Sequence, residues 1–206
     1  MTMSISIACI VEGDGEVQAV PILLRRLAQE IRPRYAIDVP YPIRVPRDKL
    51  LKGGELERYF EMAVLKAAGG GVLILIDADD PVEGCPARLG PSILKRAQAI
   101  HSAVPVLVVI AKNEYEAWFL ASAKSLRGQR GLRGDVEAPP DPEAIRGAKE
   151  WLRDRREDGR RYSETLDQPA LTARFDLQLA QRAAAFNRLY TRFGDFCDLI
   201  ARRRSN

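Results

Sequence analysis

The hydrophobic positions along the chain follow two kinds of spacing. Consecutive apolar residues, many of them β-branched, form runs with the length of buried strands. Between these runs, apolar residues recur every three or four positions, which is typical of amphipathic helices. Strands are predicted at 4–11, 37–46, 71–80 and 104–111, and helices at 16–31, 54–68, 91–102 and 113–126.

The alternation of strands and helices predicts the fold class. It favours an α/β fold, with a Rossmann-like, mostly parallel four-stranded sheet and helices on both faces. The prolines in 37–46 place that strand at an edge of the sheet. After residue 126 the strand pattern stops, and a stretch rich in Gly and Pro leads into further helical segments. We expect an α/β core over 1–126 and a helical C-terminal extension over 127–206 that packs on it.

The composition is that of an ordinary globular protein, with 46% hydrophobic and 29% charged residues. No apolar run approaches the roughly 18 residues of a membrane span, and the first residues lack the features of a signal peptide. Cys9, Cys85 and Cys197 lie far apart and show no metal-ligand spacing, as reduced thiols do. We expect a cytoplasmic protein that does not enter the membrane.

Basic residues concentrate in the C-terminal third, whereas the net charge of the whole chain is only +4. Such clusters can neutralise phosphates, although solvated helix faces carry them too. The candidates for contact with nucleic acid are Arg155, Arg156, Arg160, Arg161 and Tyr162.

Acidic residues follow each of the strongest strands. Glu12 follows the first, Asp77, Asp79 and Asp80 end the third, and Glu114 and Glu116 follow the fourth. Ligands of open parallel sheets bind at the carboxyl ends of the strands. Carboxylates gathered there repel one another unless a cation is bound, and hard oxygen ligands suit Mg²⁺ or Mn²⁺. The pattern therefore predicts a divalent-metal site.

The turn after the first strand carries further candidates. Gly13 and Gly15 are expected to let the backbone turn sharply, with Asp14 as the N-cap of the next helix. Glu16 lies one helical turn beyond Glu12 and can face the same edge. In the helix predicted at 113–126, Glu114 and Glu116 would point in nearly opposite directions, so at most one of them faces the site.

Several nucleotide and phosphate sites are excluded by the order of the motifs. Haloacid-dehalogenase phosphatases and response-regulator receivers place their aspartates after the first strand, where this chain has Glu12. The segment "LILIDADD" is similar to a Walker B strand, but G-x-x-x-x-G-K-[ST] and G-x-G-x-x-G are both absent.

Three motifs carry a resemblance to a known group of proteins. They are "EGDGE" at 12–16, "DADDP" at 77–81 and "EAWFLA" at 116–121. In this order they resemble the Toprim domain, particularly that of the overcoming-lysogenization-defect nucleases. The chain is most similar to a bacterial family with a Toprim-like fold, domain of unknown function 4276, along most of its length.

The resemblance implies a Mg²⁺- or Mn²⁺-dependent nuclease that cleaves phosphodiesters in DNA or RNA, in phage defence or DNA processing. It implies metal ligation by Glu12, Asp77 and Asp79, with Glu16 and Glu116 completing a second position. Lys149 is the catalytic candidate for neutralising charge on the phosphate. Many relatives of this kind carry an ATPase, which a partner protein would supply here. The alternative is a non-catalytic Toprim-like module that binds nucleic acid or regulates a partner protein.

Overall fold

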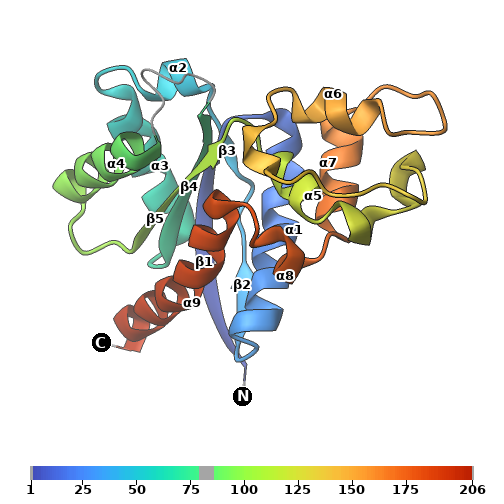
Figure 1. The fold of residues 1–206 in the computed structure, drawn as a ribbon. Helices are drawn as coiled ribbons and strands as arrows, with labels where there is room; N and C mark the ends of the chain where they lie inside the picture. The colour runs from blue at the N-terminus through green and yellow to red at the C-terminus, as the bar shows by residue number, and fades with distance from the viewer. Residues whose placement is uncertain (1, 79–85, 206) are drawn as a thin grey trace.

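The computed structural model describes residues 2–78 and 86–205, and it shows an α/β fold (Figure 1). The strands are β1 (Met3–Val11), β2 (Tyr35–Asp38), β3 (Ile43–Arg44), β4 (Gly71–Ala78) and β5 (Val106–Lys112). The α-helices are α1 (Asp14–Ile31), α2 (Arg47–Leu50), α3 (Glu55–Ala67), α4 (Pro86–Ile100), α5 (Ala117–Ala121), α6 (Ala148–Arg153), α7 (Glu164–Thr172), α8 (Leu177–Ala180) and α9 (Ala184–Ser205). Short 3₁₀ helices are η1 (Ala123–Leu126), η2 (Gln129–Gly131) and η3 (Pro142–Ala144).

All strand pairs in the described sheet are parallel, which confirms the predicted fold class. The order is β2-β1-β4-β5, and β3 pairs with β1 beyond the end of β2. The segment 37–46 therefore supplies two short strands rather than one, because Pro40 and Pro42 lie between them and cannot donate to a ladder. Both lie on the outer side of β1, as expected of an edge.

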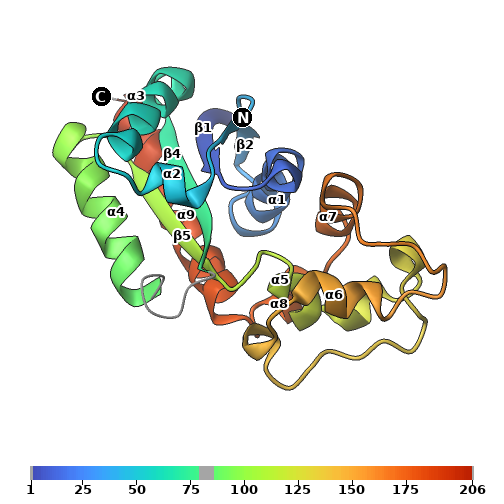
Figure 2. The same ribbon diagram turned by 90° about the horizontal axis from the view of Figure 1, so that it is seen from above.

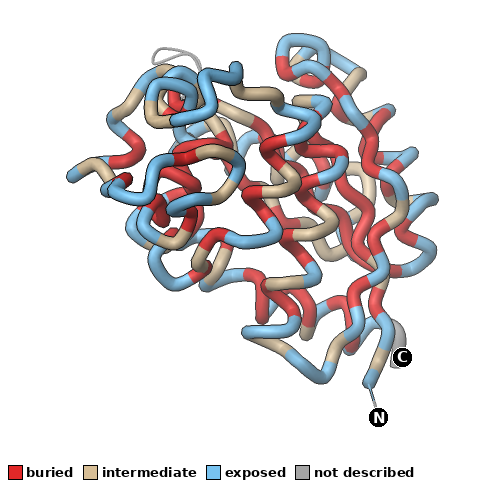
Figure 3. The backbone as a smooth tube through the Cα atoms, turned by 90° about the vertical axis from the view of Figure 1, so that its right-hand side faces the viewer, coloured by how far each residue is buried: buried red, intermediate tan, exposed pale blue. Residues whose placement is uncertain are grey.

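Alternating residues of the central strands belong to two hydrophobic clusters, one on each face of the sheet. Ile7, Cys9 and Val11 pack with α1 and α9, whereas Ala8 and Ile10 pack with α3 and α4. The sheet is thus covered on both faces, which is why its strands read as continuous apolar runs. Buried residues occur both in the α/β core and in the C-terminal extension (Figure 3).

The chain reverses its direction across the sheet between β1 and β4. From β1 it runs through α1 to β2 on one side, and it later returns through α3 to β4 on the other. Because α1 and α3 cover opposite faces, a crevice opens at the carboxyl ends of β1 and β4. This is where an open α/β sheet binds its ligand.

The C-terminal extension packs on the same face as α1. Helix α9 lies against β5, and α7 lies alongside α1 (Figures 1 and 2). The aromatic rings of Trp118 and Phe186 meet edge to face at 5.3 Å between centroids, and Phe119 meets Phe175 at 5.6 Å. The extension and the α/β part therefore share one apolar cluster.

Two local predictions were wrong. The helix expected at 113–126 begins only at Ala117, because Asn113 takes a left-handed backbone conformation (φ 64°) and residues 114–116 form a turn. The N-cap of α1 is Gly13 rather than Asp14, which is the first helical residue. The consequence is that Glu114 and Glu116 do not lie on opposite sides of a helix.

The two glycines of this turn also play roles other than those expected. Gly13 has a negative φ of −98°, which other residues adopt. A Cβ at Gly15 would lie 1.9 Å from Gln168 Oε1 and 2.6 Å from the backbone oxygen of Glu164. Gly15 is therefore needed for the close approach of α7 to α1, not for the turn.

No helix within the described ranges is both long enough and apolar enough to cross a membrane.

Replacing Gly15 by Ala should lower the free energy of unfolding by about 2 kcal/mol, because the new methyl group overpacks the α1–α7 contact. Urea denaturation measures this change. Gly53→Ala is the control, since a Cβ there meets nothing within 4 Å. Equal stability of the two variants would show that α7 does not approach Gly15 closely.

Candidate functional site

A cavity of about 230 Å³ lies at the carboxyl ends of the strands. The strand ends, the first turn of α1, the turn before α5, and helices α6 and α7 all contribute to its wall. Its polar lining is mostly acidic. The lining residues are Glu12, Gly13, Glu16, Arg44, Pro46, Asp77, Glu114, Glu116, Lys149, Glu164 and Gln168.

Glu12 and Asp77 meet at the point where the chain reverses across the sheet. Val11 is in register with Leu75, so the end of β1 lies beside the last residues of β4. The backbone N–H of Asp77 donates to Glu12 Oε2 at 3.1 Å. The odd-numbered neighbours of Asp77, Leu73 and Leu75, pack on the α1 face of the sheet. The same alternation directs Asp77 toward that face.

Glu16 is buried in the first turn of α1. Its Oε2 accepts hydrogen bonds from the backbone N–H groups of Glu12 at 2.8 Å and Gly13 at 3.1 Å. The glutamate thus satisfies N–H groups at the start of the helix, as in a capping box. Burial, helped by the nearby Glu116 and Glu12, raises the pKa of Glu16 to about 8, although the two hydrogen bonds favour the charged form.

Glu116 is fully buried at the start of α5. Its Oε1 accepts a hydrogen bond of 2.9 Å from the Tyr162 hydroxyl. Burial raises the pKa of Glu116 to about 7, although Lys149 and Tyr162 both favour the charged form. A carboxyl group with a pKa near neutrality can hold or release a proton under ordinary conditions.

Lys149, on α6, faces three carboxylates. Its Nζ lies 2.7 Å from Glu164 Oε1 and 3.7 Å from Glu114 Oε1. Burial alone would lower the pKa of Lys149, but Glu116, Glu164 and Glu114 outweigh it and raise the pKa above its ordinary value. The lysine is therefore charged and is the main cationic group facing these acids.

Sequence reasoning missed four polar residues that line the cavity, which are Arg44, Glu114, Glu164 and Gln168. Glu114 was set aside in favour of Glu116, yet its Oε2 accepts a 2.6 Å bond from the N–H of Ala148 at the start of α6. Neither Glu164 nor Gln168 belongs to the set of residues that the sequence predicts. Their spacing of four residues places them on one face of α7, which the sequence could have shown.

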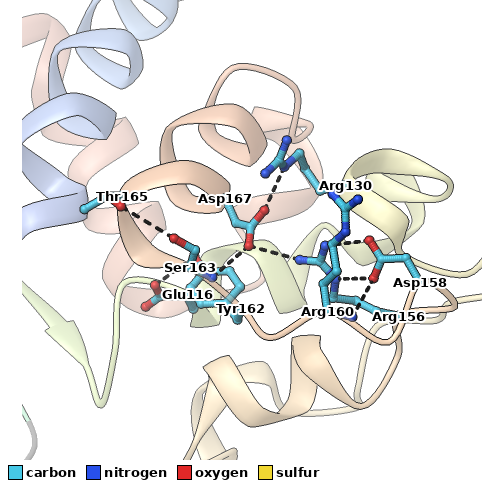
Figure 4. A network of polar contacts seen from close by, with 9 residues as sticks. All are labelled: Glu116, Arg130, Arg156, Asp158, Arg160, Tyr162, Ser163, Thr165 and Asp167. Atoms are coloured by element: carbon cyan, nitrogen blue, oxygen red, sulfur yellow. Dashed lines mark hydrogen bonds and ion pairs between the residues drawn. The ribbon is translucent and has the colours of Figure 1, made fainter.

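A buried ion-pair network holds the segment that carries Tyr162 (Figure 4). Asp167, only 2% exposed, binds Arg130 Nε at 2.7 Å and Arg156 Nη1 at 3.0 Å. It also accepts a 2.8 Å bond from the N–H of Ser163, the neighbour of Tyr162. The network thereby fixes the chain next to Glu116.

The arginines assigned to nucleic-acid contact separate into two groups. The side chain of Arg156 is 5% exposed and is bound by Asp158 and Asp167, so it has no surface to offer a phosphate. Arg155 stacks on Trp151 at 3.8 Å from the ring centroid. Arg160 and Arg161 are exposed on the loop that leads to Tyr162.

The donor chemistry of the cavity fits a hard divalent cation, because its acidic lining offers only carboxylate oxygens. Within residues 2–78 and 86–205, however, no three acidic, His or Cys side chains lie close enough to form a ligand group. Asp79, the third ligand expected from the sequence, lies outside the described residues.

The substitution Asp167→Asn should lower the free energy of unfolding by about 2 kcal/mol, because it removes one of the two counter-ions of the buried Arg156 and the counter-ion of Arg130. Chemical denaturation measures this loss. Asp135→Asn is the control, since Asp135 is 81% exposed and its pair with Arg133 should contribute less than about 0.5 kcal/mol. Similar losses in both variants would contradict a structural role for the network.

The raised pKa values of Glu16 and Glu116 predict a pH dependence of stability. Between the usual pKa near 4.5 and the folded values of about 8 and 7, the folded protein binds more protons than the unfolded chain. The free energy of unfolding should therefore fall as pH rises through this range. In thermal melts from pH 5 to 8.5, the Tm of the wild type should fall relative to that of Glu16→Gln/Glu116→Gln. If the Tm of the wild type and that of the double variant changed with pH in the same way, the raised pKa values would be contradicted.

Comparison with curated proteins and with solved structures finds no match to this chain. Comparison with protein families finds one described as "Domain of unknown function (DUF4276)", whose profile matches residues 11–194. The match includes the segments that supply every acidic residue of the cavity, from Glu12 to Glu164. The chain therefore belongs to the DUF4276 family.

Proposed function

We propose that this protein is a Toprim-like nuclease that uses Mg²⁺ or Mn²⁺ to hydrolyse phosphodiesters in DNA or RNA. The observation that carries the proposal is the acidic cavity at the carboxyl ends of β1 and β4. Burial and mutual repulsion hold two of its glutamates at raised pKa values. Such a cavity has an excess of negative charge that a divalent cation would offset.

Glu12, Asp77 and Asp79 would hold the metal, and Glu16 and Glu116 would complete a second position. A divalent cation bound there would supply Lewis-acid stabilisation of the charge that develops on phosphoryl oxygens. Glu12 and Asp77 already meet through a hydrogen bond, which supports their assignment to one site.

The remaining polar groups have roles suited to hydrolysis. The Lys149 ammonium, charged and 2.7 Å from Glu164, can also neutralise a phosphate that enters the cavity. The Tyr162 hydroxyl holds Oε1 of Glu116, which orients this carboxyl for the second metal position.

The exposed basic loop supports a nucleic-acid substrate. Arg160 and Arg161 directly precede Tyr162, whose hydroxyl reaches Glu116. Consecutive Cα atoms are about 3.8 Å apart, so both arginines are anchored close to the cavity. They can bind phosphates of a strand whose scissile bond lies at Glu116.

One observation favours the alternative, a non-catalytic module that binds nucleic acid or regulates a partner protein, such as an ATPase. Among the acids that the structure describes, no three gather as metal ligands, and Lys149 is engaged with Glu164 and Glu114. In that reading Lys149 would be the permanent counter-ion of the cavity.

The experiment incubates the protein with single- and double-stranded DNA and RNA, with Mg²⁺ or Mn²⁺. Cleavage should depend on the metal and should fall at least about 100-fold in Glu12→Gln and Asp77→Asn, beyond the 10- to 100-fold loss typical of outer residues. Asp135→Asn, exposed in its loop, should retain the wild-type rate.

A thermal-shift assay with each metal separates the two functions. Stabilisation by Mn²⁺ that the Asp77→Asn variant abolishes, without cleavage of any substrate, would favour the binding module. The absence of both cleavage and stabilisation would overturn the metal site.

A further inference from the structure

Strand β5 forms one edge of the sheet and pairs with β4 alone among the described strands. An edge strand presents backbone N–H and C=O groups that another strand can bind. Proteins commonly protect such edges with charged residues, proline or bulges. Here the sequence "VLVVIA" is apolar throughout, and only the last residue of β5, Lys112, is charged.

A groove of about 570 Å³ runs along this edge between α4 and α9. Leu94 of α4, Val106 and Val108 of β5, and Leu189 and Phe196 of α9 give it an apolar lining. The two helices flank the edge on opposite faces of the sheet (Figures 1 and 2). This space suits a single extended segment, whereas a second copy would bring its own α4 and α9 into it.

Two arginines of α9 give the groove a charge preference. Arg188 and Arg192 both line it and are exposed, and neither forms an ion pair within the part of the chain that the structure describes. Like charges four residues apart destabilise a helix. The pair therefore has no evident role inside the fold, and it suits carboxylates from outside.

The spacing of these arginines matches that of an extended chain. Four residues along α9 span about 6 Å, and alternate side chains of a strand repeat at about 6.6 Å. Helix α9 runs back along β5 in both views (Figures 1 and 2). Asp195, less than one turn beyond Arg192, also lines the groove and would repel a third carboxylate.

We propose that the groove binds an extended acidic segment of a partner protein, which joins the sheet as a further strand beside β5. Two carboxylates at alternate positions would pair with Arg188 and Arg192, and apolar side chains would fill the space toward Leu94 and Phe196. Backbone pairing supplies affinity, and the side-chain pockets supply specificity. This proposal does not depend on the chemistry of the acidic cavity.

The probe is a capped, fluorescein-labelled peptide of seven residues, the length of β5. It contains two glutamates separated by one valine, and its other residues are valines. Fluorescence anisotropy should show saturable binding that Arg188→Glu/Arg192→Glu weakens at least about tenfold. Arg202→Glu is the matched control, because Arg202 is exposed on the same helix but does not line the groove. It should leave the affinity unchanged.

Two further peptides test the mode of binding. Methylation of alternate backbone nitrogens, or lysine in place of glutamate, should each weaken binding at least about tenfold. The proposal is overturned if the wild type binds no glutamate peptide, or if the double variant binds it equally well. It is also overturned if sedimentation velocity shows a dimer that the double variant dissociates, because the occupant would then be a second copy.

Discussion

The contact of α7 with the first turn of α1 at Gly15 is the constraint on which the candidate site depends. Only a residue without a side chain lets the backbone of Glu164 approach so closely. This contact brings Glu164 and Gln168 over the carboxyl end of β1. It also brings Tyr162, two residues earlier, to Glu116. A helical extension thereby closes a crevice that the sheet alone would leave open.

The closed crevice concentrates acids that the fold only partly neutralises. Six carboxylates line it among the described residues, and the two cations there are already engaged, Lys149 with Glu164 and Arg44 with Asp14. Because Glu16 and Glu116 are buried, protonation is the way in which the protein alone lowers the repulsion. A bound cation would achieve the same result and keep the carboxylates ionised. Burial and charge would thus couple the affinity for a cation to pH.

The α/β fold could be predicted because buried parallel strands produce continuous apolar runs, which residues 71–76 and 106–111 display without interruption. The strand ends then placed Glu12 and Asp77 together. What the pattern could not show is the tertiary approach of α7, which makes Gly15 a packing residue and adds Glu164 to the cavity. Nor could it show that Asn113 breaks the helical phase and turns Glu114 inward. These features depend on single backbone conformations and long-range contacts, to which periodicity is insensitive.

The cavity and the edge groove arise from the two places where a parallel sheet leaves its strands incomplete. At the carboxyl ends, strand pairing stops, and the Glu12 side chain accepts the hydrogen bond from the backbone N–H of Asp77. At β5, the pairing stops while the strand remains apolar and extended. The C-terminal extension covers the carboxyl ends of the strands but not the β5 edge. Helices α6 and α7 enclose the carboxyl ends, whereas α9 covers the face of the sheet and leaves the β5 edge accessible beside Arg188 and Arg192. A partner strand at that edge would extend the sheet whose carboxyl ends form the acidic cavity. It would pair directly with β5, the strand that leads to Glu114 and Glu116.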